Sequence, residues 1–105
     1  MNTPVINKKD LIARLLSQEV QIQAFGVRSL GIFGSFARDN ANEKSDVDVF
    51  VDIAIEHKTL KNFIALATRL EEITGRKVEL ITPQSLNRYT GKYILNEVEY
   101  VPFAA

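Results

Sequence analysis

Acidic and apolar residues alternate between Asp46 and Val51, and this alternation narrows the possible folds more than any other feature. Successive side chains of a β-strand point to opposite faces of a sheet. Asp46 and Asp48 would therefore share one face, while the valines between and after them would enter a core on the other. The pattern predicts a strand over residues 45–51 with two carboxylates on its outer face.

Strand and helix patterns alternate along the rest of the chain. Apolar periodicity predicts a helix over residues 8–25 that buries Val20, and a helix over residues 60–74 that buries Leu60 and Ile64. The other expected elements are strands over residues 27–33 and 77–82, a helical turn at 36–38, short helices near 84–88 and around 94–95, and an edge strand at 99–101. This order predicts an α+β fold (α/β-like) with one small mixed sheet and helices packed against it.

The composition excludes several classes of function. The 105 residues include no cysteine, which removes disulfides, thiolate metal sites and cysteine nucleophiles. Thirteen basic residues balance thirteen acidic ones, and this balance argues against nucleic acid as a direct substrate. No linker or long apolar run interrupts the chain, so we expect one domain over residues 1–105, no membrane partner and a cytoplasmic location.

Three groups of residues predict a site for a metal ion and a nucleotide. Gly34 and Ser35 follow an expected strand, where free N–H groups and the serine hydroxyl can bind an anion. Asp46 and Asp48 follow after ten intervening residues, and two carboxylates on one face repel each other unless a cation lies between them. Glu79 occupies the outward position of the third strand. Oxygen ligands of this kind favour Mg²⁺ or Mn²⁺ over zinc.

The run GSFARDNANEKSDVDVFVD resembles the GS-x10-DxD signature of the DNA polymerase β-like nucleotidyltransferases. With KVELITP downstream, the chain is similar to the minimal nucleotidyltransferases, or MNT domains, and the resemblance implies their polymerase β-like palm fold. It also implies that Gly34 and Ser35 hold the triphosphate of ATP or another nucleoside triphosphate. Asp46 and Asp48 would bind two Mg²⁺ ions (or Mn²⁺), and Glu79 would bind one of them and help to activate the acceptor hydroxyl.

Two positions depart from the pattern of that family. The third carboxylate is usually aspartate, and Glu79 is longer by one methylene. The residue after Arg38 is commonly glycine, whereas this chain has Asp39, which adds a negative charge near the expected phosphates. Arg38 would offset that charge, either as a phosphate ligand or as an ion-pair partner of Asp39.

The resemblance further implies a partner protein. MNT domains are typically paired with a HEPN-domain ribonuclease toxin, and they act as antitoxins by transferring AMP from ATP to a tyrosine of the toxin. A chain this short has few residues left to form walls around a base and an acceptor, so a partner or a homodimer would supply them. Two alternatives stay open, namely a non-catalytic module that occludes its partner, and the catalytic subunit of a small-molecule nucleotidyltransferase.

Overall fold

The computed structural model describes residues 3–87 and 91–104 and contains one four-stranded mixed sheet with the strand order β3-β2-β1-β4. The central strand β1 pairs antiparallel with β2 and with β4, whereas β2 and β3 run parallel. The predicted fold class is therefore confirmed. The strands are β1 (Val27–Phe33), β2 (Val47–Ile53), β3 (Val78–Ile81) and β4 (Glu99–Tyr100).

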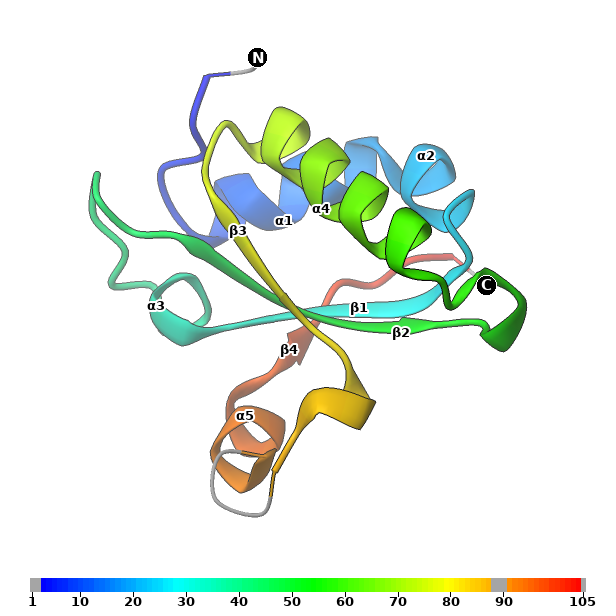
Figure 1. Ribbon diagram of the computed structural model, residues 1–105. Coiled ribbons are helices and arrows are strands. Elements are labelled where there is room, and N and C mark those ends of the chain that lie inside the picture. The colour runs from blue at the N-terminus through cyan, green and yellow to red at the C-terminus, as the bar shows by residue number, and fades with distance from the viewer. Residues whose placement is uncertain (1–2, 88–90, 105) are drawn as a thin grey trace.

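The helices lie mainly on one face of this sheet. Figure 1 shows α1, α2 and α4 together above the strands, and α5 on the opposite side. A parallel strand pair needs a crossover connection, and α4 supplies it between β2 and β3. None of the helices in the described ranges has both the length and the apolar character that crossing a membrane requires. The helices are α1 (Lys8–Ser17), α2 (Glu19–Gln23), α3 (Gly34–Ala37), α4 (Leu60–Thr74) and α5 (Gly91–Glu97), with 3-10 turns η1 (Ile55–His57) and η2 (Pro83–Ser85).

The predicted valine face of β2 enters the core beneath these helices. Val47, Val49 and Val51 are fully buried, and the register places Ile32 of β1 and Leu80 of β3 on either side of Val49. Since side chains alternate along a strand, the other face carries Asp48, which leaves the carboxylates outside the main core.

The predicted first helix is interrupted at Gln18. Asn7 caps α1 as its side chain accepts the Asp10 N–H, but the Ser17 hydroxyl donates to the Arg14 carbonyl, which the Gln18 N–H would use in a continuous helix. The Gln18 N–H bonds to the Leu15 carbonyl instead, and α2 starts at the next residue, Glu19. The prediction that Val20 is buried is wrong, because its side chain is 82% exposed.

The predicted second helix has the expected bounds, and Gly75 ends it with a φ of 71°. Only some of the apolar residues of this helix are buried against the rest of the protein. Leu66 and Leu70 are fully buried, whereas Leu60 and Ile64 are 75% and 55% exposed, contrary to the prediction. A single sheet covers only one side of α4, so apolar residues at the margin of the stripe stay in contact with water.

The other bounds shift by a few residues. β2 begins at Val47, two residues later than predicted, so Asp46 lies at the end of the preceding loop. The strand predicted at 99–101 is a two-residue edge strand, and the one predicted at 77–82 is confirmed as the shorter β3. Of the helix predicted near 84–88, the structure shows the turn η2, and Arg88 lies outside the described residues.

The two sides of α4 provide a test of this packing. Leu70→Ala should lower the free energy of unfolding by about 2–5 kcal/mol, because it removes a fully buried side chain. Ile64→Ala, on the exposed side of the same helix, should cost less than about 1 kcal/mol. Urea denaturation followed by circular dichroism measures both, and equal losses would contradict the assigned orientation of the helix.

Candidate active site

The parallel register of β2 and β3 brings two carboxylates into contact. Asp48 of β2 is aligned with Glu79 of β3, and their side chains share a hydrogen bond. On its other side, Asp48 is aligned with Phe33, which ends β1 and is only 8% exposed. Glu79 is exposed, in agreement with the outward position predicted for it, and neighbours in register project from the same face.

The pKa of Asp48 is raised from its ordinary value of 3.8 to about 6, and burial is the largest cause. The rest of this increase comes from the charge of Glu79, the hydrogen bond with Glu79, and the charges of Asp46 and Glu97. Every named contribution disfavours the ionised form of Asp48. The cluster therefore attracts whatever can neutralise it, a proton or a cation.

Gly34 sits directly against this pair, at the point where β1 ends. A β-carbon added to Gly34 would lie 2.1 Å from Oδ2 of Asp48, and the φ of Gly34 is 73°, which side chains other than glycine rarely adopt. Gly34 and the partly buried Ser35 begin the helical turn α3, which starts two residues before the turn predicted at 36–38. A glycine with positive φ followed by helical residues aligns successive backbone N–H groups, an arrangement that can bind an anion. The absence of a side chain at Gly34 thus lets the Asp48 carboxylate lie directly against the backbone of the turn.

Asp46 stands apart from the close pair. It is exposed and lies in the loop just before β2, although its charge still acts on Asp48. Across residues 3–87 and 91–104, no three His, Cys, Asp or Glu side chains come close enough together to form a preformed metal site. The structure therefore brings Asp48 and Glu79 into contact, and it leaves Asp46 on the neighbouring loop.

The close pair fits a hard divalent cation. All the side-chain donors are carboxylate oxygens, and Mg²⁺ is commonly held by one or two carboxylates together with phosphate oxygens of a substrate. Gly34 lies directly beside the Asp48 carboxylate, so a phosphate held by the N–H groups of its turn would lie close to this pair. The donor chemistry agrees with the predicted Mg²⁺ or Mn²⁺.

Arg38 forms an ion pair with Glu97 of α5. One of the two sequence interpretations expected its ion-pair partner to be Asp39, and the structure does not show that pair. The Asp39 carboxylate accepts a hydrogen bond from the Lys8 N–H at the start of α1, and this hydrogen bond stabilises its negative charge. Asp39 also has a φ of 57°, which explains why glycine is usual at this position of the family. Glu97 was missed by the sequence analysis, since no motif links α5 to the site.

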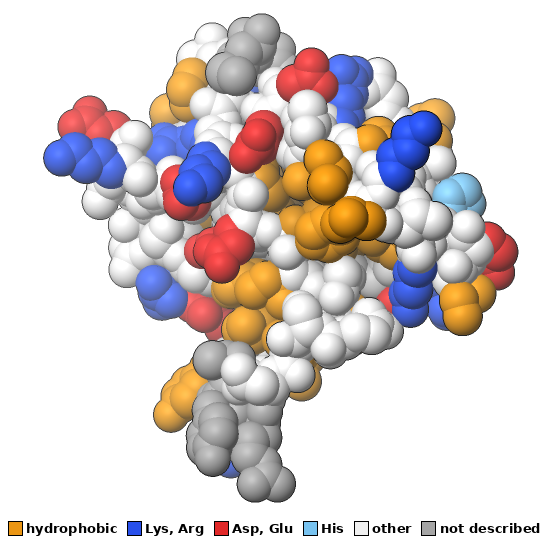
Figure 2. Space-filling view, viewed as in Figure 1, with side chains coloured by type: hydrophobic (Ala, Val, Ile, Leu, Met, Phe, Trp, Pro, Cys, Tyr) orange, Lys and Arg blue, Asp and Glu red, His pale blue; other side chains and the backbone are white. Residues whose placement is uncertain are grey.

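The carboxylate pair lies on an open surface. Figure 2 shows acidic side chains, mixed with basic ones, on the side of the molecule that carries α3 and β3. Two depressions of about 440 and 380 Å³ lie elsewhere, the first beside Lys8 and Lys9 and the second between Phe63 of α4 and Gln84 of η2. Neither depression is lined by Asp48 or Glu79.

The raised pKa of Asp48 predicts a pH-dependent stability. Because the folded state holds this proton more tightly than the unfolded state, stability should fall as pH rises from about 4 to about 6. Asp48→Asn should therefore raise the Tm by several degrees above pH 6 and have little effect at pH 4. Thermal melts at both pH values measure the difference.

Asp52→Asn is the matched control, since Asp52 lies on the same strand and face and is aligned with Ser29 instead of Glu79. A Tm for Asp48→Asn that stays below the wild-type value at pH 8 would contradict the assigned repulsion.

Comparisons with known proteins agree with this geometry. The family model of the nucleotidyltransferase domain matches residues 11–101. The protein adenylyltransferase MntA of Thermococcus cleftensis is 44% identical over 79 residues, which is 75% of this chain and 79% of that protein.

Two solved structures share the fold. One, assigned as a minimal nucleotidyltransferase, has a TM-score of 0.75 at 28% identity and covers 90% of this chain and 95% of its own. The other, a Shewanella oneidensis complex of a tri-AMPylated HEPN toxin with an MNT antitoxin, has a TM-score of 0.58 at 16% identity, with 92% and 71% covered, and shows likeness of fold alone. The chain belongs to the nucleotidyltransferase domain family, and it is a homologue of the adenylyltransferase MntA.

Proposed function

We propose that this nucleotidyltransferase transfers AMP from ATP to a tyrosine hydroxyl of a HEPN ribonuclease toxin and so acts as its antitoxin. The observation that carries the proposal is the contact between Asp48 and Glu79 beside Gly34. The adenylyl donor is supported by the 44% identity to a protein adenylyltransferase. The partner is supported by the shared fold with the antitoxin of an AMPylated HEPN toxin.

Each predicted residue has a part in this reaction. Asp46, Asp48 and Glu79 would hold two Mg²⁺ ions, which when bound neutralise the phosphate charges of the reacting groups. The N–H groups of Gly34 and Ser35 and the Ser35 hydroxyl would orient the triphosphate. Such positioning supplies much of the rate enhancement in phosphoryl-transfer chemistry.

The chemical step replaces a phosphoanhydride bond of ATP with a phosphodiester bond to tyrosine. The tyrosine oxygen forms a bond to the α-phosphorus of ATP, the bond from that phosphorus to the bridging oxygen breaks, and pyrophosphate leaves. The proton of the tyrosine hydroxyl passes to the carboxylate of Glu79, which is exposed and so within reach of an acceptor. A bulky anionic nucleotide on the toxin would then block the approach of RNA by steric exclusion and charge repulsion.

The open surface explains why a partner is required. Since the described residues form little wall around the carboxylates, a docked protein would cover the ATP and exclude water from the reacting atoms. The same reasoning leaves room for a homodimer, which stays a prediction. Neutral net charge gives no attraction to nucleic acid, so a protein acceptor is the better match.

The proposal predicts a mass change on the partner. The chain should be co-expressed with a HEPN protein, and the purified complex incubated with Mg²⁺ and ATP. Intact-mass spectrometry should show AMP-sized increments on the HEPN protein. Asp48→Asn should slow the transfer by more than about a hundredfold, because it removes an interaction worth several kcal/mol.

Asp52→Asn on the same face of β2 is again the matched control and should transfer AMP at nearly the wild-type rate. A stable complex without any mass change would contradict adenylyl transfer and favour neutralisation by occlusion. AMP transfer to small hydroxylated compounds without a protein partner would favour the small-molecule alternative.

Arg38 provides a second prediction about the reaction. As a phosphate ligand it must leave Glu97, so Glu97→Gln should lower the KM for ATP by about two- to fivefold, the range expected for a partly exposed ion pair. Arg38→Gln should raise the KM. In the double variant the effect of Glu97→Gln should shrink, and steady-state kinetics of all four proteins measure this coupling. Fully additive effects would show that Arg38 does not bind the triphosphate.

A further inference from the structure

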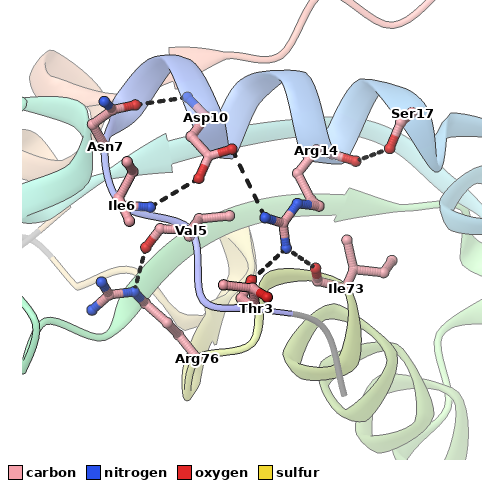
Figure 3. A network of polar contacts seen from close by, with 9 residues as sticks. All are labelled: Thr3, Val5, Ile6, Asn7, Asp10, Arg14, Ser17, Ile73 and Arg76. Carbon is pink, nitrogen blue, oxygen red and sulfur yellow. Dashed lines mark hydrogen bonds and ion pairs between the residues drawn. The ribbon is translucent and has the colours of Figure 1, made fainter.

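Arg76 connects the segments that carry the candidate site, although it lies between α4 and β3 and outside every motif. Its Nε donates to the Val5 carbonyl at 2.7 Å, a contact that Figure 3 shows. Its Nη1 donates to the carbonyls of Asn42 and Ser45 at 2.8 and 2.9 Å. One guanidinium therefore joins the N-terminal segment to the loop that precedes β2.

The loop contact acts directly beside Asp46. The Ser45 carbonyl, bonded by Arg76, comes just before Asp46, and the Val47 N–H just after it donates to the Lys77 carbonyl at 2.9 Å. Two consecutive residues, Arg76 and Lys77, thus hold the backbone on both sides of Asp46. The Asp46 side chain is exposed, so these backbone contacts determine where its carboxylate lies.

The loop itself is a tight turn that Arg76 completes. The Asn42 N–H donates to the Ser45 hydroxyl at 2.9 Å, and the Ser45 N–H donates back to the Asn42 carbonyl at 3.0 Å. The Asn42 side chain accepts the Lys44 N–H at 2.8 Å. Both carbonyls that Arg76 binds belong to the ends of this turn, and its planar, rigid donor fork suits such a paired contact.

Arg76 also contacts the turn that holds Gly34 and Ser35. Its guanidinium carbon lies 5.1 Å from the centre of the Phe36 ring, within the range of a cation–π interaction. Phe36 is fully buried in α3, so this contact fixes the position of the guanidinium relative to the turn of Gly34 and Ser35. The same side chain therefore contacts Phe36, next to Ser35, and the carbonyl of Ser45, next to Asp46.

From these contacts we infer that Arg76 is a positioning residue, which sets the Asp46 carboxylate at the correct distance from the Gly34–Ser35 turn and from the Asp48–Glu79 pair. This inference rests on the proposed function of these carboxylates as ligands of a divalent cation. A structural role alone would affect stability, whereas a positioning role must also affect the affinity for the cation.

The test compares two arginines that stabilise the same N-terminal segment. Arg14 donates to the carbonyls of Thr3 and Ile73 at 2.7 and 3.0 Å but does not touch the loop before β2 (Figure 3). Arg76→Lys keeps the charge but loses the fork, and it should weaken Mn²⁺ binding by roughly tenfold, as changes to groups that orient metal ligands commonly do. Arg14→Lys should change that affinity by less than about twofold.

Electron paramagnetic resonance measures free Mn²⁺ during titration of the folded, nucleotide-free proteins, and circular dichroism verifies the fold. If Arg76→Lys does not fold, Asn42→Ala serves as a second test variant. Asn42→Ala loosens the same exposed turn, so it should also weaken Mn²⁺ binding. An affinity equal to that of Arg14→Lys in either test variant would overturn the inference.

The two proposals can fail separately. A wild-type protein that binds Mn²⁺ in an Arg76-dependent manner, but transfers no AMP, would contradict the proposed function and support the positioning role. AMP transfer that persists with unchanged Mn²⁺ affinity in Arg76→Lys would contradict the positioning role alone. A wild-type protein that binds no Mn²⁺ would overturn both.

Discussion

The repulsion between Asp48 and Glu79 is the interaction on which the account of this protein depends. The parallel register of β2 and β3 aligns the two carboxylates, and burial beside Phe33 keeps water from screening Asp48 fully. Two such groups in contact cost free energy unless a proton or cation joins them. The core valines on the opposite face of β2 maintain this alignment, so packing stabilises an arrangement that electrostatics opposes. Strain of this kind, held by the rest of the fold, is typical of functional sites.

The division of the sheet into two faces explains the shape of the site. One face carries α1, α2 and α4 (Figure 1). Apolar side chains pack beneath these helices, and the carboxylates lie on the other face, beside the Gly34 turn. A metal and a triphosphate need only that turn and a few oxygen ligands. A base and an acceptor need walls, and the described residues supply few of them. The proposed dependence on a second protein rests on this lack of walls.

Much of the fold was predictable because its signals are local. Gly75 ends α4 through its positive φ angle, Gly26 takes a positive φ in the turn between α2 and β1, and alternation at 47–51 defines the faces of β2. The break at Gln18 was not predictable, because it depends on a hydroxyl of Ser17 that competes for one carbonyl. For the site, strand alternation predicted the outward direction of Glu79, but only the register shows its contact with Asp48. Glu97 and Arg76 act across long sequence separations, and no spacing pattern identifies them.

The most direct test of the central claim is a crystal structure of the protein with Mn²⁺ and a non-hydrolysable ATP analogue. Anomalous scattering locates Mn²⁺ without reference to any assigned role. The account predicts Mn²⁺ between the carboxylates of Asp48 and Glu79, with the triphosphate against the N–H groups of Gly34 and Ser35. A triphosphate bound elsewhere, such as the depression beside Lys8 and Lys9, with no Mn²⁺ at the carboxylate pair, would contradict it.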